Sequence, residues 1–204
     1  MRSVGVGIAV LVIVMASSVA HGSEEGLLSG SVRMALEGVS LEDAGSVVVF
    51  LEPQGRMPSL GSVPPTRLRQ RAARFDPPFL TVSVGQVVEM PNDDIIYHNV
   101  FSYSAPNDFD LGLYAAGDAR SLRFEHAGLV RVYCSIHEDM DALIFVAPTR
   151  LHSVAGPDGR YAITAVPPGR YRVRVWSERL PETDGFVVVE GATSLDLMLG
   201  TPAS

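Results

Sequence analysis

Short runs rich in β-branched residues constrain the fold of this chain more than any other feature. Runs of about four to eight such residues, bounded by Gly, Pro, Asn or Asp, are typical of β-strands. No long segment carries apolar residues at helical spacing, so we expect an all-β protein, built as a sandwich or a barrel. The expected strands are 46–51, 80–84, 86–90, 95–101, 121–124, 130–134, 143–146, 160–164, 170–176 and 185–189.

Residues 1–22 have the layout of a secretory signal peptide. Arg2 supplies the positive start, Val4–Met15 is an uncharged apolar run, and small residues follow it. A membrane anchor is the alternative, but the run is shorter than the ~20 residues that span a bilayer. No cysteine lies near the cleavage region, which argues against a lipoprotein. We therefore expect a soluble periplasmic protein with no stable membrane insertion after cleavage.

The charge balance excludes one large class of function. The chain carries 16 basic and 23 acidic residues, for a formal net charge of −7. Binding to nucleic acid needs clustered positive charge that neutralises phosphates, so no nucleic-acid partner is expected. The one basic cluster is interpreted as a solvated loop. It consists of Arg67, Arg69, Arg71 and Arg74.

The part of the chain after the signal peptide divides into four zones. Residues 23–57 carry one or two strands, and residues 58–74 contain a Pro-Pro pair and are expected to form a linker loop. Residues 75–147 are a compact series of strands that holds every candidate functional residue. Residues 148–204 begin with a turn-rich run. Arginine and apolar residues then alternate along 171–176, which predicts one buried and one solvated face.

The only cysteine lies in a sequence with metal-ligand spacing. A lone thiol in an exported protein cannot form an intrachain disulfide, and metal ligation explains its presence. Cys134, His137 and Met140 follow one another at intervals of three residues. With five histidines and seven methionines in 204 residues, chance gives that spacing roughly once in 1,200 chains with one cysteine.

The residue types in this stretch indicate copper. With His98 from upstream, the set comprises one thiolate, two imidazoles and one weak axial thioether, which is the ligand set of a blue-copper site. Soft sulfur stabilises Cu(I), and imidazole suits both oxidation states. One loop at a strand end can place Cys134, His137 and Met140 around a single metal. His98 must come from a different strand.

Residues 75–147 resemble a cupredoxin, the Greek-key β-sandwich family of plastocyanin and amicyanin. The short Cys-x2-His-x2-Met loop is similar to that of amicyanin. The chain is also similar to exported proteins labelled plastocyanin-like or methylamine-utilisation-like. Further matching segments are Val84–Asn92, His98-Asn99-Val100 and the approach Gly128-x-x-x-x-Tyr133-Cys134.

The resemblance implies a role for each residue of the site. Cys134 is the thiolate ligand, and His98 and His137 are the imidazole ligands. Met140 is the axial ligand of a single type 1 copper. Asn99 ties the His98 strand to the cysteine loop through hydrogen bonds. In the family, the histidine after the cysteine exposes its edge, so His137 is the expected electron port.

The partner expected from the resemblance is a redox protein, such as a cytochrome or a dehydrogenase. Family loops commonly place proline or an apolar residue between the last histidine and the methionine, where this chain has Glu138 and Asp139. The acidic residues of the zone are interpreted as a solvated surface. The alternative is a docking face for a basic partner. These residues are Asp93, Asp94, Asp108, Asp110, Glu138, Asp139 and Asp141.

The zone 148–204 resembles the carboxypeptidase regulatory-like (transthyretin-like) β-sandwich. The similarity rests on Asp158-Gly159-Arg160-Tyr161 and on Pro167–Tyr171. That module has no catalytic residues. Its usual opening strands are missing from the zone, but residues 27–52 contain similar ones. We therefore expect 27–52 and 148–199 to fold together, with the copper domain inserted between them.

Two hypotheses of function remain from different classes. The first is an exported one-electron carrier that cycles between Cu(II) and Cu(I), has no substrate turnover and is not an enzyme. The second is a periplasmic copper-binding or copper-trafficking protein that uses the same ligands without electron transfer. A hydrolase with Cys134 as nucleophile needs a positioned base and oxyanion donors. A structural adhesion sandwich leaves the ligand residues unexplained.

Other candidate residues have more ordinary interpretations. His21, His126 and His152 are expected to face solvent, because the ligand set is complete without them. Tyr97 and Tyr133 flank ligands, but aromatic residues in strands are more often part of a core than redox relays.

Overall fold

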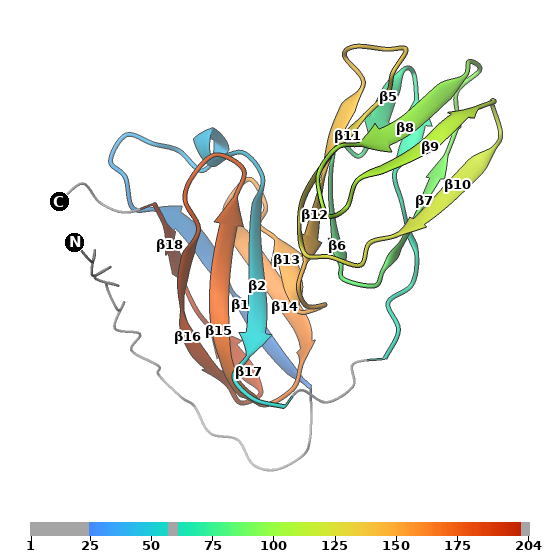
Figure 1. The fold of residues 1–204 in the computed structure, drawn as a ribbon. Coiled ribbons are helices and arrows are strands. Elements are labelled where there is room, and N and C mark those ends of the chain that lie inside the picture. The colour runs from blue at the N-terminus through green and yellow to red at the C-terminus, as the bar shows by residue number, and fades with distance from the viewer. Residues whose placement is uncertain (1–24, 57–60, 201–204) are drawn as a thin grey trace, which may run out of the picture. The chain divides into compact units, whose positions relative to one another are not determined.

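Nearly all the regular structure in the computed structural model is β-strand, which confirms the all-β class expected from the sequence. The structure describes residues 25–56 and 61–200. Within these ranges the only helical element is η1 (Glu42–Ala44), a single 3-10 turn. The described residues divide into two compact units (Figure 1). The split unit is formed by 25–56 with 151–200, and the continuous unit by 61–150.

The expected signal peptide, residues 1–22, lies outside the described residues. No helix in the described ranges has the length and apolar character needed to cross a bilayer. Export of the chain therefore remains a prediction from the sequence.

Each of the two sheets in the split unit combines strands from both ends of the described chain. The strands are β1 (Gly26–Met34), β2 (Val47–Pro53), β13 (His152–Val154), β14 (Arg160–Val166), β15 (Gly169–Ser177), β16 (Thr183–Val189), β17 (Ala192–Ser194) and β18 (Leu197–Leu199). One sheet has the order β14-β1-β17, with β18 also paired to β1, and the other has the order β13-β2-β15-β16. Leu51 of β2 lies opposite Val173 of β15. Residues 47–53 thus pair with strands that follow residue 151 in the sequence.

Strand β15 has the alternation predicted for residues 171–176. Tyr171, Val173 and Val175 are buried, whereas Arg172 and Arg174 between them are partly exposed. Arg172 Nε lies 2.8 Å from Oδ2 of Asp184 on the neighbouring β16. This hydrogen bond from Arg172 is the main reason that the pKa of Asp184 lies below its usual value. The polar face of the strand is therefore stabilised by cross-strand charge pairs.

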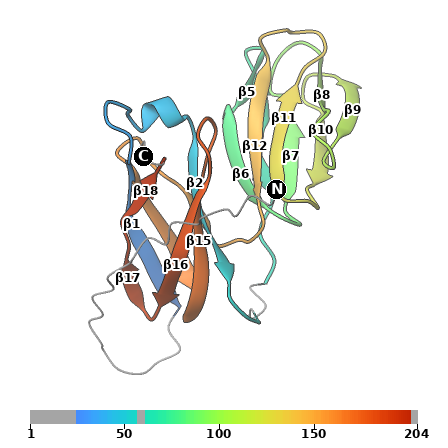
Figure 2. The ribbon, with the colours of Figure 1, turned by 60° about the vertical axis from the view of Figure 1, so that its left-hand side comes forward.

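The continuous unit is a β-sandwich of two sheets and a small hairpin (Figures 1 and 2). Its strands are β3 (Thr66–Arg67), β4 (Arg69–Arg71), β5 (Arg74–Asp76), β6 (Phe79–Ser83), β7 (Val87–Pro91), β8 (His98–Ser102), β9 (Phe109–Tyr114), β10 (Ala119–Arg123), β11 (Gly128–Tyr133) and β12 (Asp141–Ala147). The sheet orders are β10-β7-β3 and β6-β12-β11-β8-β9, and β4 pairs with β5. Val88 and Met90 of one sheet share a buried core with Val100, Val130 and Ile144 of the other.

The range 58–74, expected to be a linker loop, instead contains β3, β4 and the first residue of β5. The reason is that Leu68 and Gln70 are completely buried in the continuous unit. The Gln70 side chain donates hydrogen bonds to the backbone oxygen of Met90 and to the Tyr114 hydroxyl. An isolated linker has no means to bury such groups.

The basic cluster in this range is largely exposed, as expected, but its arginines lie on strands β3, β4 and β5 and not in a loop. Arg67 Nε lies 2.9 Å from Oε2 of Glu89 on β7, and Arg69 forms an ion pair with Asp93. Two of its four arginines therefore bind carboxylates of the same unit.

The strand expected at 95–101 begins only at His98. Local side-chain hydrogen bonds explain the difference, because such bonds compete with strand pairing. The Asn92 side chain donates to the backbone oxygen of Ile96 and accepts the N–H of Asp94. Asp94 in turn accepts the N–H of Ile95. Residues 93–97 thus form a compact loop directly before His98.

Candidate metal centre

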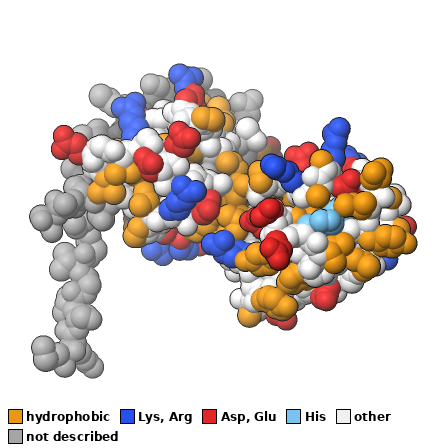
Figure 3. Space-filling view, turned by 90° about the horizontal axis from the view of Figure 1, so that it is seen from above, with side chains coloured by type: hydrophobic (Ala, Val, Ile, Leu, Met, Phe, Trp, Pro, Cys, Tyr) orange, Lys and Arg blue, Asp and Glu red, His pale blue; other side chains and the backbone are white. Residues whose placement is uncertain are grey.

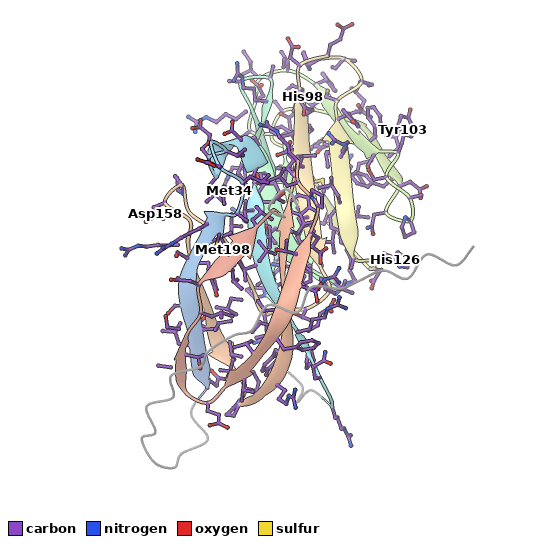
Figure 4. The ribbon with its side chains drawn as sticks, turned by 90° about the vertical axis from the view of Figure 1, so that its left-hand side faces the viewer. Met34, His98, Tyr103, His126, Asp158 and Met198 are labelled. Carbon is purple, nitrogen blue, oxygen red and sulfur yellow. The ribbon has the colours of Figure 1, made fainter. Side chains whose placement is uncertain are left out.

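The four candidate ligands come from strand β8 and from the loop that follows its neighbour β11. His98, which Figure 4 labels, is the first residue of β8. Cys134 follows the last residue of β11. His137 and Met140 lie in the loop between β11 and β12. The backbone N–H of Cys134 donates to Met140 O at 3.1 Å, and that of Met140 donates to His137 O, also at 3.1 Å. These two bonds curl the loop back on itself.

The donor atoms of His98, Cys134 and His137 converge, all within 4.8 Å of one another. The Nδ1 atoms of the two histidines are 3.1 Å apart. Cys134 Sγ lies 3.8 Å from Nδ1 of His98 and 3.6 Å from Nδ1 of His137. Ligands bound about 2.0 Å (nitrogen) and about 2.3 Å (sulfur) from one tetrahedral metal lie roughly 3.2 to 3.8 Å apart. The three side chains therefore fit a single metal ion.

The two candidate histidine ligands differ in how deeply they are buried. The His98 side chain is completely buried and Cys134 is 6% exposed, whereas His137 is partly exposed. Met140 is 1% exposed and belongs to the same buried core as Cys134. The structure thus places Met140 in the same core as Cys134, in an apolar setting that suits a thioether.

Asp94 orients His98, a role that the sequence analysis did not assign. Its Oδ2 atom lies 3.1 Å from Nε2 of His98, and it also accepts the backbone N–H of Ala73 at 2.7 Å. This bond from Ala73, followed by that from Ile95, holds the pKa of the Asp94 carboxyl below its usual value. An ionised carboxylate only accepts hydrogen bonds, so Nε2 of His98 carries the proton and Nδ1 presents its lone pair to the centre.

The β4–β5 hairpin supplies the Ala73 N–H through an unusual turn. Ala72 and Ala73 both have φ of 53°. A type I′ hairpin turn requires this left-handed region at both of its central residues. The turn places the N–H of Ala73 against Asp94. The hairpin thus belongs to the support of the centre, although the sequence analysis placed it in a linker loop.

Replacing Asp94 with Ala is expected to weaken copper binding about 10- to 100-fold, the usual cost of losing such an outer partner of a metal-binding histidine. The affinity is measured by competition with a chelator of known strength. Asp93→Ala is the matched control, because Asp93 pairs with Arg69 and does not touch His98. Equal affinities for Asp94→Ala and the unmodified protein would contradict the assignment.

Asn99 links strand β8 to the cysteine loop by a hydrogen bond, as the resemblance implied. Its side chain is 6% exposed, and its Oδ1 accepts the backbone N–H of Ser135 at 2.7 Å. Ser135 directly follows Cys134, so this bond joins β8 to the start of the ligand loop.

The surface around the centre mixes apolar and acidic side chains. Four large apolar side chains close to His98 or His137 in the sequence are exposed. They are Ile95 (92% exposed), Ile96 (41%), Tyr97 (57%) and Ile136 (52%). Figure 3 shows hydrophobic side chains gathered around a histidine on one face. Tyr97 is thus a surface residue, contrary to the expectation that it belongs to the core.

The remaining candidates are placed as follows. Five of the seven acidic residues are exposed, namely Asp108, Asp110, Glu138, Asp139 and Asp141. Asp93 forms an ion pair with Arg69, and Asp94 contacts His98. His126 is exposed, as expected, and His152 is partly buried. His21 lies outside the described residues.

Comparisons with known proteins give structural neighbours only. No protein-family model matches the chain, and the search of curated proteins found no relative. The neighbours among solved structures are cupredoxins. A purple cupredoxin from Nitrosopumilus maritimus is 26% identical, with a TM-score of 0.37, over 40% of this chain and 99% of that one. A Cu(I) mutant of amicyanin is 22% identical, with a TM-score of 0.38, over 40% of this chain and 81% of that one. A reduced mutant of amicyanin is 20% identical, with a TM-score of 0.39, over 48% of this chain and 97% of that one.

Proposed function

We propose that this chain is an exported type 1 copper protein that carries single electrons between redox partners. The observation that supports this most directly is the convergence of one cysteine sulfur and two histidine Nδ1 atoms in a largely buried site. Copper bound there would supply the one-electron couple Cu(II)/Cu(I). His98, Cys134 and His137 would hold it, with Met140 as a weak axial ligand.

The protein side of this function is to keep the ligands in one arrangement. Asp94 fixes the ring of His98, Asn99 fixes the start of the ligand loop, and two backbone bonds close that loop around Met140. A set of ligands held in this way moves little when the charge of the metal changes. A small rearrangement favours rapid electron transfer.

The route of the electron in this proposal is the edge of His137. That side chain is partly exposed, while His98 is completely buried. Exposed Ile95, Ile96 and Ile136 offer apolar contacts to a partner, in place of the apolar loop residues that Glu138 and Asp139 replace. The proposed partner is a redox protein that binds transiently at this surface.

A hydrolase is the alternative that the same atoms could suggest, since Cys134, His98 and Asp94 form a Cys-His-Asp series. Cys134 and His98 are buried, however, and a nucleophile has to reach the carbonyl carbon of its substrate. A second imidazole, that of His137, also occupies the space next to the sulfur. We therefore propose that the chain is not an enzyme.

The proposal is tested by voltammetry of the mature, copper-loaded protein. A reversible one-electron wave is expected, together with a blue colour that ascorbate bleaches and ferricyanide restores. A competing Cu(I) chelator distinguishes the trafficking alternative. Rapid loss of Cu(I) to the chelator without a reversible wave would favour trafficking and overturn electron transfer.

A further inference from the structure

The edge strand β9 has an irregularity beside the centre. Asn99 of β8 lies opposite Leu113 of β9, but Phe101 lies opposite Asp110, so β9 holds one extra residue between these pairs. This is a β-bulge, and Gly112 within it has φ of 69°. Bulges are common next to functional sites, where they redirect a side chain.

The bulge directs Asp110 towards Asn99. Oδ1 of Asp110 accepts the backbone N–H of Gly112 at 2.9 Å and the side-chain N–H of Asn99 at 3.1 Å. Asn99 Oδ1 accepts the N–H of Ser135 at 2.7 Å. A continuous series of hydrogen bonds therefore runs from the edge strand to the residue that follows Cys134.

The chemistry of these groups allows only one orientation of the Asn99 amide. An ionised carboxylate is only an acceptor, and a backbone N–H is only a donor. If the amide were turned over, its oxygen would face the carboxylate of Asp110, and its NH2 group would face the N–H of Ser135. Both contacts would be repulsive. Asp110 thus selects the orientation in which Asn99 holds the ligand loop.

We infer that Asp110 is a positioning residue of the metal centre: from the β9 bulge it fixes the Asn99 amide, and through it the backbone next to Cys134. The inference rests on the proposed function only for its effect on copper. Its effect on the ligand loop is a property of the metal-free chain. Asp110 is itself exposed, so replacing it is not expected to disturb the buried core.

The test compares three variants of the full mature chain. Asp110→Ala removes the acceptor and the charge, while Asp110→Asn keeps an oxygen that can accept from both Asn99 and Gly112. Asp108→Ala is the matched control. Asp108 is exposed, and its carboxylate has no hydrogen-bond or ion-pair partner within the described ranges. Only the first variant breaks the series of hydrogen bonds.

The first readout is hydrogen exchange of the Ser135 N–H in the metal-free protein, followed by NMR. We expect exchange about fivefold faster in Asp110→Ala, which corresponds to the loss of one ordinary hydrogen bond. Asp110→Asn and Asp108→Ala are expected to match the unmodified chain. Unchanged exchange in Asp110→Ala, or equally fast exchange in Asp110→Asn, would overturn the inference.

The second readout is the rate at which a chelator removes copper from the loaded protein. The rate is expected to rise about fivefold in Asp110→Ala and to stay unchanged in Asp110→Asn and Asp108→Ala. An equal rise in both Asp110 variants would indicate a charge effect and overturn the positioning role. If the unmodified chain binds no copper, the proposed function fails. The exchange measurement still decides the role of Asp110 in that case.

Discussion

Cys134→Ala is expected to abolish the blue colour of the copper-loaded protein completely. The intense visible absorption of a type 1 site comes from charge transfer between thiolate and copper, and Cys134 is the only cysteine in the sequence. No other side chain of this protein can replace that transition. Visible absorption spectra after addition of Cu(II), recorded with and without ascorbate, measure the effect.

Met140→Leu is the matched control for this experiment. Met140 is buried in the same core as Cys134, and exchange of methionine for leucine nearly conserves the volume of the core. Because the thioether is a weak axial ligand, we expect this variant to remain coloured, with a changed reduction potential. Blue Cys134→Ala protein, or a colourless unmodified protein, would contradict the assignment of the ligands.

Phe124→Ala is expected to destabilise the continuous unit by about 3–5 kcal/mol, the usual cost of removing a buried aromatic ring. Phe124 is 1% exposed, and its ring meets that of Phe109 edge-on, with the centroids 6.1 Å apart. A domain is stable by about 5–15 kcal/mol, so much of its stability would be lost. Urea unfolding of the metal-free protein measures the change in free energy.

Phe186→Ala provides the comparison for this second prediction. It removes the same ring from a strand surface, where the side chain is 56% exposed. Such a surface change is expected to alter the free energy of unfolding by no more than about 0.5 kcal/mol. An equal decrease in the free energy of unfolding in the two variants would show that burial in the sandwich core does not determine the destabilisation.

The candidate ligands could be proposed from the sequence because most of them are local. Cys134, His137 and Met140 lie in one short loop, where spacing and residue type limit what the side chains can bind together. His98 was identifiable from its neighbours Asn99 and Val100. The structure brings the donor atoms of His98, Cys134 and His137 together, as that prediction requires.

The supporting residues were not identifiable in the same way. Asp94 looked like one of several surface acids, and its contact with His98 depends on the turn of Asn92 and on the hairpin at Ala73. The strand containing Asp110 was not predicted at all, because Asp and Gly are poor strand formers. Its pairing with β8 overrides that local preference.

The sequence by itself determined the all-β class, the loop that carries the candidate ligands and the alternating faces of strands such as β15. These features depend on period, turn residues and spacing over a few positions. Residues 27–52 were expected to fold with 148–199, but only the tertiary structure decided which strands pair, as in the pairing of 47–53 with β13 and β15. It also decided that residues 66–76 form strands of the continuous unit, and that Asp94 and Asp110 support the site. The physical reason is that these outcomes depend on which distant groups satisfy each buried donor and acceptor, and pairing over long separations leaves no periodic signal in the chain.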